Sequence, residues 1–310
     1  MFDIGGDMSE SRSRVIYGFF GLVGVMFISL LVFAFLLLRN FSPRSLDSVS
    51  SFNRSSVGVV EVKGPILESK KIIKKLLKAE EDESLKAIIL RVDSPGGAVG
   101  PTQEIFDEIV RIDASKPVYA SFGSVAASGG YYIGAAARKI YANKGTITGS
   151  IGVIMQFVDL SKVYEFLKLK PEIIKSGIYK DIGSPSRPMT NKEKSLLNST
   201  ITKVHDQFRE DILSRREGKI KGDLLSLSQG QIFSGQEALE YGLVDEIGGM
   251  WGLSKDIHEE LKLAGNFRKL KFIKLKKDMS IISILENLED PSDFARGLIY
   301  KFIRPMFLAI

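Results

Sequence analysis

The sequence predicts an α/β protein in which a parallel sheet is built from strands that alternate with helices. Short runs rich in β-branched and aliphatic residues recur along the chain. Segments with the apolar spacing of a helix separate several of these runs, and glycine or proline marks many of their ends. Parallel strands require crossover connections of this kind, because a tight hairpin can join only antiparallel neighbours.

The first part of the predicted sheet comes from the segment that follows residue 56. Val57–Val62 is a β-branched run that ends at a Gly-Pro turn, and Ser69–Ala79 has apolar residues on one helical face. Ala87–Val92 is the second predicted strand, Gln103–Ile112 is the next helix, and Pro117–Phe122 is the third strand.

Shorter elements are predicted beyond this point. The small and aromatic residues of Tyr131–Ala137 have helical character, while Lys139–Ala142 and Ile151–Phe157 are expected to be the fourth and fifth strands. A capping box at Thr190–Glu193 predicts the start of a long helix. Apolar and basic residues alternate in Phe267–Leu275, which is typical of an exposed strand or of a segment on a membrane surface.

One long apolar segment lies near the start of the sequence. Val15–Leu38 contains no charged residue and no proline. As a helix it would be about 36 Å long, which is enough to cross the hydrocarbon core of a bilayer. No small-residue cleavage site follows it, so we expect an uncleaved transmembrane anchor. Ser42–Ser56 is rich in serine and is expected to be a linker.

The composition excludes some kinds of chemistry. The chain has 310 residues and no cysteine, which excludes thiolate catalysis, disulfides and thiolate metal sites. The net charge is +6, but the basic residues are spread along the chain. This distribution gives little support to a nucleic-acid groove and fits a position near an anionic membrane at least as well.

A serine occupies a junction where a nucleophile would be expected. The apolar strand that includes Val118–Phe122 leads into Ala126–Gly130, where Ser128 lies between alanines and glycines just before the Tyr131–Ala137 helix. Small neighbours allow a substrate carbonyl to approach, and a helix N-terminus offers free N–H groups to an oxyanion. A glycine-rich turn between buried elements is the alternative interpretation.

A second glycine-containing loop follows a neighbouring strand. Pro95–Gly97 lies beyond Ala87–Val92, and ligands in parallel α/β sheets bind beyond the carboxyl ends of the strands. Glycine leaves the backbone free to turn an N–H group toward a carbonyl oxygen. Gly97 and Gly129 are therefore candidate donors to an oxyanion.

A serine hydroxyl needs a base, and the sequence offers few candidates. His205 and His258 are the only histidines, and both lie in predicted amphipathic helices without a glycine-rich setting. Lys180 differs from most lysines of the chain because glycine, aromatic and apolar residues surround it in Ser176–Pro185. A lysine can act as a general base where burial and neighbours favour its neutral form. An exposed lysine is the alternative.

Together these motifs resemble the signal peptide peptidase A family in its short bacterial, membrane-anchored form. The resemblance covers about residues 57–261 and rests on an ordered set of motifs: Asp93–Gly97, Ala126–Tyr132, Thr146–Gly152, Ser176–Asp181, Ser184–Arg187, Phe233–Ala238 and Gly242–Asp245. It implies a fold similar to the Clp protease proteolytic subunit and the crotonases, in which ββα units are wound into a spiral.

The resemblance also implies a role for each candidate. Ser128 matches the nucleophile, Lys180 matches the general base, and Ser150 matches the serine that orients the lysine amine. Lys180 would take the proton of Ser128 and later give it to the leaving amine. Water would then hydrolyse the acyl-enzyme. The family does not settle whether Lys180 serves its own subunit or an adjacent one.

The oxyanion site and the cofactor requirement follow from the same resemblance. Gly129 matches one donor, and the Pro-Gly-Gly loop holds the other, for which we choose Gly97 over Gly96. The mechanism requires no metal and no nucleotide. Peptide substrates, a membrane and a homo-oligomeric ring are the implied partners, without nucleic acid.

The implied protein is a serine endopeptidase that degrades cleaved signal peptides, and other envelope peptides, at the bacterial inner membrane. Its catalytic domain would lie on the periplasmic side. The expected organisation is a cytoplasmic tail (1–14), an anchor (15–38), a linker (39–56), a catalytic domain (57–261) and a basic, amphipathic extension (262–310). A crotonase-like acyl-CoA enzyme and a stomatin-operon-type membrane protease or scaffold are the alternatives.

The end of the sequence suggests two further hypotheses. Phe294–Ile310 is apolar with three interspersed basic residues, and it would lie in a bilayer interface or pack as a helix on a neighbouring subunit. Within it, Met306–Ile310 is apolar and free of proline. This short segment therefore resembles a substrate and is a candidate to enter an active site.

Overall fold

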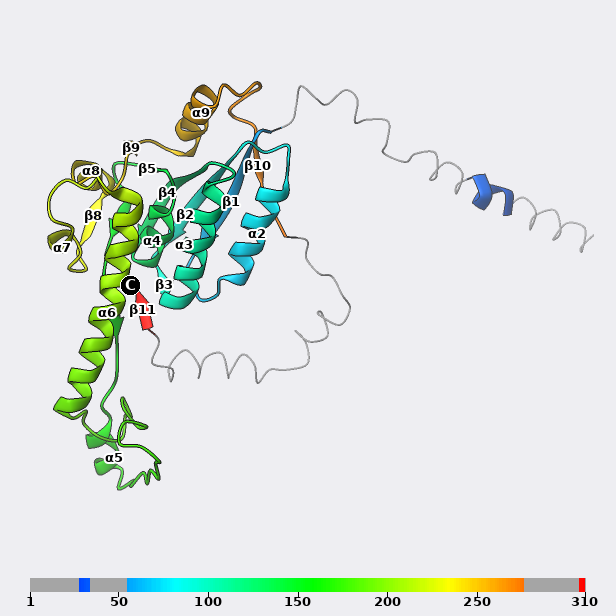
Figure 1. The fold of residues 1–310 in the computed structure, drawn as a ribbon. Helices are drawn as coiled ribbons and strands as arrows, with labels where there is room; N and C mark the ends of the chain where they lie inside the picture. The colour runs from blue at the N-terminus through cyan, green and yellow to red at the C-terminus, as the bar shows by residue number, and fades with distance from the viewer. Residues whose placement is uncertain (1–27, 34–54, 276–306, 310) are drawn as a thin grey trace, which may run out of the picture. The chain divides into compact units, whose positions relative to one another are not determined.

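The structure is a computed structural model that describes residues 28–33, 55–275 and 307–309 (Figure 1). It divides into two compact units, residues 1–53 and residues 54–310. In the first unit, residues 28–33 are helical. The rest of the predicted anchor and the predicted cytoplasmic tail lie outside the described residues. Within the described parts of the chain, no helix combines the length and the apolar character that crossing a bilayer requires.

A parallel sheet forms the centre of the second unit. Its main path runs in the order β10-β1-β2-β4-β5-β9, and every pair along this path is parallel. The strands are β1 (Val57–Lys63), β2 (Ala87–Ser94), β4 (Val118–Ala127), β5 (Lys139–Ala142), β9 (Glu246–Ile247) and β10 (Leu270–Phe272). The predicted mixed α/β fold with a central sheet is therefore confirmed. The alternating segment at 267–275 supplies an edge strand, β10.

Helices cover both faces of this sheet. On one face lie α2 (Lys70–Glu81), α3 (Val99–Asp113) and α4 (Gly129–Ala135), and on the other lies α9 (Met250–Glu260). The central strand β2 is fully buried at Ile88, Ile89, Leu90 and Val92. A continuous apolar run of this kind is typical of a parallel strand that is covered on both faces.

The prediction of a single strand over Ile151–Phe157 was wrong. The structure instead has β6 (Ile147–Gly149) before this run and only β7 (Ile154–Met155) within it. Gly149 and Ser150 have φ angles of 77° and 50°. These left-handed residues turn the chain between the two short strands, so β6 stays beside β4 while β7 joins a different sheet.

Two short additions complete the strand pattern around β6 and β7. β8 (Ile232–Ser234) pairs with β6 in an antiparallel manner. A separate small sheet has the order β3-β11-β7, with β3 at Gly97–Ala98 and β11 at Phe307–Ala309.

A projecting segment, residues 156–190, connects β7 to the long helix α6 (Asn191–Arg216). We call it the arm; it holds α5 (Ser161–Phe166) and extends away from the sheet along one end of α6 (Figure 1). α6 begins with the predicted capping box, in which Thr190 and Glu193 hydrogen-bond reciprocally. No residue of α5 is buried, and Ile174 in the arm is fully exposed. The remaining helices are α7 (Leu224–Leu227) and α8 (Gly235–Glu240).

A buried ionic contact fastens α6 to the sheet. The Arg216 side chain is fully buried, and its guanidinium donates to the Gly242 carbonyl oxygen at 2.8 Å and to Asp245 Oδ2 at 3.0 Å. The same Asp245 oxygen accepts the Ile140 N–H of β5 at 2.7 Å. One carboxylate thus connects the last turn of α6 with the strand next to β4.

Replacing Arg216 with methionine should lower the free energy of unfolding by about 3 kcal/mol, because Asp245 loses its buried partner. Lys255→Met is the matched control, since Lys255 pairs with Glu259 on the exposed face of α9. That change should cost less than about 1 kcal/mol. Urea unfolding followed by circular dichroism measures both. Equal stability of the two variants would contradict the role assigned to Arg216.

Candidate active site

Ser128 occupies a strained backbone position between β4 and α4. Its φ and ψ are 53° and −118°, a conformation that costs a residue with a side chain about 1–3 kcal/mol. The Ser128 N–H donates to the Gly149 carbonyl oxygen at 2.8 Å, and its own carbonyl oxygen accepts the Tyr132 N–H at 2.9 Å. The end of β6 and the first turn of α4 therefore hold the strained conformation from both sides.

The Ser128 hydroxyl is fully buried and has no hydrogen-bond partner among the described residues. Leaving such a group unpaired costs about 1–3 kcal/mol. Native proteins keep few such groups, and reactive sites are among the places where they occur. The observation is consistent with a nucleophile whose partner comes from a substrate or from another polypeptide.

The backbone of the Pro-Gly-Gly loop lies very close to the backbone at the start of α4. A Cβ atom on Gly129 would lie 3.2 Å from the Gly97 nitrogen and 2.9 Å from Thr102 Oγ1. A Cβ on Gly97 would lie 2.0 Å from the Ile66 carbonyl oxygen. Glycine is required at position 97, and the two predicted oxyanion donors are neighbours in space.

The hydrogen bonds of the loop favour Gly97 over Gly96 as the donor. The Gly96 N–H donates to Ser94 Oγ at 3.2 Å, and the Gly96 carbonyl oxygen accepts the Ile66 N–H at 2.8 Å. Both backbone groups of Gly96 are thus engaged within the loop. Gly129 is the first residue of α4, where N–H groups have no intrahelical acceptor.

Ser150 lies directly beside the Ser128 backbone. It follows Gly149, whose carbonyl oxygen accepts the Ser128 N–H, and its own N–H donates to the Gln231 carbonyl oxygen at 2.8 Å. Ser150 is largely buried and has a positive φ. The structure therefore gathers Ser128, Gly129, Gly97 and Ser150 in one region.

Lys180 is not part of that cluster within one chain. Its side chain is exposed on the arm, whereas the Ser128 hydroxyl is buried without a partner among the described residues. The next residue, Asp181, accepts from Arg187 at 2.9 Å and from Lys175 at 2.6 Å. These hydrogen bonds hold the pKa of the Asp181 carboxyl well below its usual range and fix the arm around Lys180.

The two histidines have different surroundings. His258 Nδ1 lies 2.7 Å from the Ser254 carbonyl oxygen within α9, far along the chain from the serine loops. Burial lowers the pKa of His205, and the charge of Arg209 adds to this shift. The charge of Asp206 opposes this shift, and His205 Nε2 is buried without a hydrogen-bond partner among the described residues. His205 lies near the backbone of Ile151, the residue after Ser150. The sequence did not suggest this proximity.

An apolar pocket flanks the small sheet. It is lined by Val99, Tyr132, Val153, Val204 and Phe208. Val99 directly follows β3, and Val153 directly precedes β7. Apolar side chains therefore lie beside both of these short strands.

A third strand already lies between β3 and β7. β11 is antiparallel to both, with Leu308 opposite Ala98 and Ile154 and with Ala309 opposite Gly97 (Figure 1). This pairing agrees with the hypothesis that the end of the sequence enters an active site. The neighbouring segment 276–306 lies outside the described residues.

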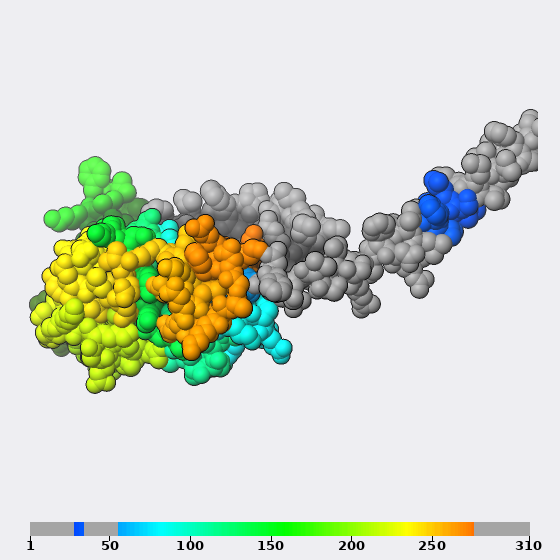
Figure 2. All heavy atoms as spheres, turned by 90° about the horizontal axis from the view of Figure 1, so that it is seen from above, coloured from blue at the N-terminus to red at the C-terminus, as the bar shows by residue number. Residues whose placement is uncertain are grey.

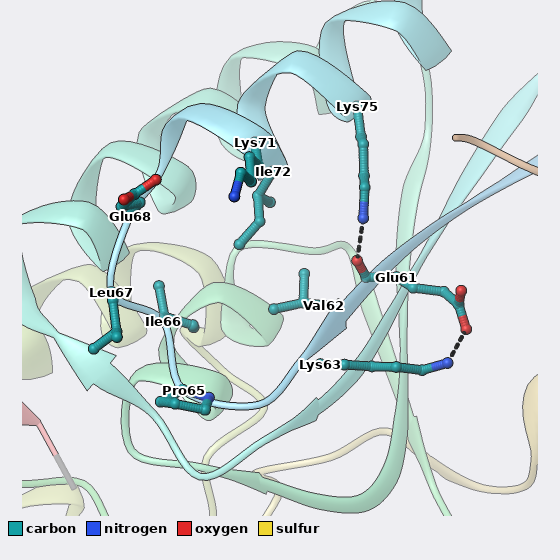
Figure 3. A pocket seen from close by; sticks show the side chains of 10 residues that line it. All are labelled: Glu61, Val62, Lys63, Pro65, Ile66, Leu67, Glu68, Lys71, Ile72 and Lys75. Carbon is teal, nitrogen blue, oxygen red and sulfur yellow. Dashed lines mark hydrogen bonds and ion pairs between the residues drawn. The ribbon is translucent and has the colours of Figure 1, made fainter. Parts of the chain in front are cut away.

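A more polar pocket lies between β1 and α2. Figure 3 shows Ile66 and Val62 on its apolar side and charged side chains around it. Two of these charges form an ion pair, in which Lys63 Nζ lies 2.7 Å from Glu61 Oε1. Lys75 Nζ donates a hydrogen bond to the Glu61 backbone carbonyl oxygen at 3.1 Å. The pocket includes none of the predicted site residues and meets the serine region only through Ile66.

Among the described residues, no cluster of three or more histidine, aspartate and glutamate side chains is arranged to hold a metal ion.

Comparison with known proteins gives two matching family models. Peptidase family S49 matches residues 111–264, which include Ser128, Ser150 and Lys180. The Clp protease model matches residues 44–146, which include Gly97 and Ser128. All predicted site residues therefore lie within protease matches.

Similar proteins include two from bacteria and one from a plant. A candidate protease of Synechocystis sp. is 39% identical over 196 residues, which cover 63% of this chain and 70% of that protein. A candidate signal peptide peptidase SppA of Enterococcus faecium is 34% identical over 204 residues, covering 66% and 58%. The chloroplastic serine protease SPPA of Arabidopsis thaliana is 33% identical over 204 residues, covering 64% and 30%. The matched part thus spans less than two thirds of the latter two proteins.

Substituting Gly129 with alanine should slow the reaction of Ser128 with a fluorophosphonate probe by about a hundredfold, because the new Cβ would crowd the Gly97 nitrogen, where the oxyanion is expected to bind. Gly145→Ala is the control, since a Cβ there meets no atom within 4 Å. Labelling rates of both variants and of Ser128→Ala would be compared. A Gly129→Ala rate equal to that of the unmodified protein would rule out this oxyanion site.

Proposed function

Because the chain belongs to peptidase family S49 and is therefore a serine peptidase, we propose that it is a membrane-anchored endopeptidase with Ser128 as nucleophile and Lys180 as general base. The observation that carries the proposal is the buried, unpartnered hydroxyl of Ser128 at a strained strand-to-helix junction. Both matching family models are proteases, which favours peptide substrates over the acyl-CoA esters of the crotonase-like alternative. The predicted spiral of ββα units belongs to the same proposal.

The chemistry follows from the groups around Ser128. Neutral Lys180 removes the hydroxyl proton as Ser128 Oγ attacks the scissile carbonyl carbon. The N–H groups of Gly97 and Gly129 stabilise the oxyanion of the tetrahedral intermediate, which the helix N-terminus also favours. Lys180 then gives the proton to the leaving amine, and water hydrolyses the acyl-enzyme. Ser150 keeps the lysine amine oriented.

We further propose that Lys180 reaches Ser128 across a subunit interface. The arm carries Lys180 and many exposed apolar side chains, among them Phe166 and Ile174. Apolar surface on a projecting segment favours cover by another polypeptide. A second copy that covered the arm would also remove water from the lysine amine, which favours its neutral form. A closed homo-oligomer provides such an interface for every subunit.

The proposed substrates are apolar peptides in extended conformation. The two short strands β3 and β7 offer backbone pairing to an extended peptide, and apolar side chains lie beside them. Signal peptides remaining in the membrane after secretion have this apolar character, and one relative is named a signal peptide peptidase. The apolar segment Val15–Leu38 would anchor the enzyme to that membrane, with the catalytic domain on the periplasmic side.

Replacing Lys180 with alanine should lower kcat/KM for a fluorogenic apolar peptide at least about a thousandfold, because the nucleophile loses its base. Thermal unfolding should not change, since the side chain is exposed. Lys170→Ala removes another exposed lysine of the arm and should leave cleavage unaffected. Equal loss of activity in both variants would point to the arm as a whole rather than to Lys180.

Mixing the two inactive variants tests the position of the base. If Lys180 serves a neighbouring Ser128, co-assembled Ser128→Ala and Lys180→Ala chains should regain about one quarter of the activity, because random pairing joins both intact residues at that frequency. If both residues act in one chain, the mixture stays inactive. The assay requires refolding or co-expression of the two variants, with each variant alone as its control.

A further inference from the structure

The pocket between β1 and α2 has an apolar wall and a charged rim (Figure 3). Val62 and Ile66 are buried on the apolar side, and the exposed Leu67 continues this side to the surface. The volume of the pocket is about 340 Å³, which lies in the range of small-ligand sites. Such sites are mostly apolar and contain a few polar groups. The pocket therefore suits a short apolar chain with one polar end.

Lysine amines outnumber carboxylates around this pocket. Its rim contains Lys63, which is paired with Glu61, and two further lysines. Lys75 is half-buried, and its amine donates to the neutral Glu61 carbonyl oxygen. Lys71 has no hydrogen-bond or ion-pair partner among the described residues. The remaining carboxylate, Glu68, lies at the opposite end of the pocket from Lys75 (Figure 3). Because an ammonium group that is partly removed from water is stabilised by an opposite charge, this rim favours an anion.

The apolar wall of the pocket also holds the Pro-Gly-Gly loop. The Ile66 N–H donates to the Gly96 carbonyl oxygen at 2.8 Å, and the Ile66 carbonyl oxygen accepts the Ala98 N–H at 2.8 Å. Gly97 lies between these two contacts and forms a parallel bridge with Ile66. A ligand that packs against the Ile66 side chain therefore contacts the residue that holds the candidate oxyanion donor in place.

We propose that this pocket binds an apolar chain that ends in a carboxylate, and that its occupation makes Ser128 more reactive. The carboxylate pairs with the amines of Lys71 and Lys75. The chain packs against Ile66 and Leu67. The described structure has the pocket and the Pro-Gly-Gly loop formed together, so a ligand that fits the pocket favours this arrangement of the loop. The effect on Ser128 rests on the proposed function, whereas binding does not.

Protection of lysines from acetylation tests the binding site directly. Octanoate is the probe, and the full chain is treated briefly with N-hydroxysuccinimide acetate and analysed by mass spectrometry. Octanoate should slow acetylation of Lys71 about tenfold at a concentration near ten times its Kd. Lys74 is the internal control, since it is exposed on α2 and does not line the pocket. Octanol, which lacks the carboxylate, should protect neither lysine.

The rate of fluorophosphonate labelling of Ser128 tests the effect on the active site. Octanoate should raise this rate about fivefold, whereas a ligand in the substrate groove would lower it by competition. Lys75→Met should require about tenfold more octanoate for the same effect, because it loses a charged partner of the carboxylate but keeps an apolar side chain. Lys74→Met is the matched control and should respond like the unmodified chain.

A capped dileucine peptide with a free carboxylate, and its amide, distinguish the two sources of this chemistry. Protection of Lys71 by the peptide acid but not by octanoate identifies a peptide end as the ligand, and the reverse identifies a fatty acid. Absence of protection by both carboxylates would overturn the binding site. Protection without faster labelling would overturn the link through Ile66. If the chain did not react with fluorophosphonate under any condition, the proposed function would fail, while the acetylation experiment would still decide binding.

Discussion

The site depends on the hydrogen bond from the Ser128 N–H to the Gly149 carbonyl oxygen. It continues the pairing of β4 with β6 by one residue beyond the strand, and so holds Ser128 at a φ of 53°. The same bond fixes the distance between the serine and Ser150, which follows Gly149. Without it, the strained serine would relax by about 1–3 kcal/mol, and its hydroxyl would lose its direction.

Close backbone approach is the second constraint. The loop after β2 and the start of α4 meet where Gly97, Gly129 and Gly130 lie, and a Cβ on Gly130 would be 2.6 Å from the Ser94 carbonyl oxygen. Side chains there would separate the two loops and move the candidate oxyanion donors apart. The glycines thus allow the two loops to pack closely, so that two parallel strands end in one shared site.

The sequence predicted correctly those elements whose burial or capping is reflected directly in their residue types. The buried run of β2 and the capping box of α6 were read correctly from sequence, since burial on both faces and reciprocal capping leave a direct trace in residue type. Ile151–Phe157 was misread because its apolar residues do not reveal the left-handed turn at Gly149 and Ser150. The contact of Gly97 with Ile66 had no sequence signal beyond the preceding Gly-Pro turn, because it joins residues that are far apart in the sequence. The proposed approach of Lys180 to Ser128 involves another chain, which no local pattern encodes.

The proposed dyad is divided between the sheet domain, which holds Ser128, and the exposed arm, which holds Lys180. The strained serine and the glycines proposed as oxyanion donors lie together within one chain, whereas Lys180 lies on an exposed arm. A free subunit would then have a formed site without proton transfer. Assembly would supply both the base and the dry surroundings that favour its neutral form. Under the proposed arrangement, activity would therefore be limited to the oligomer.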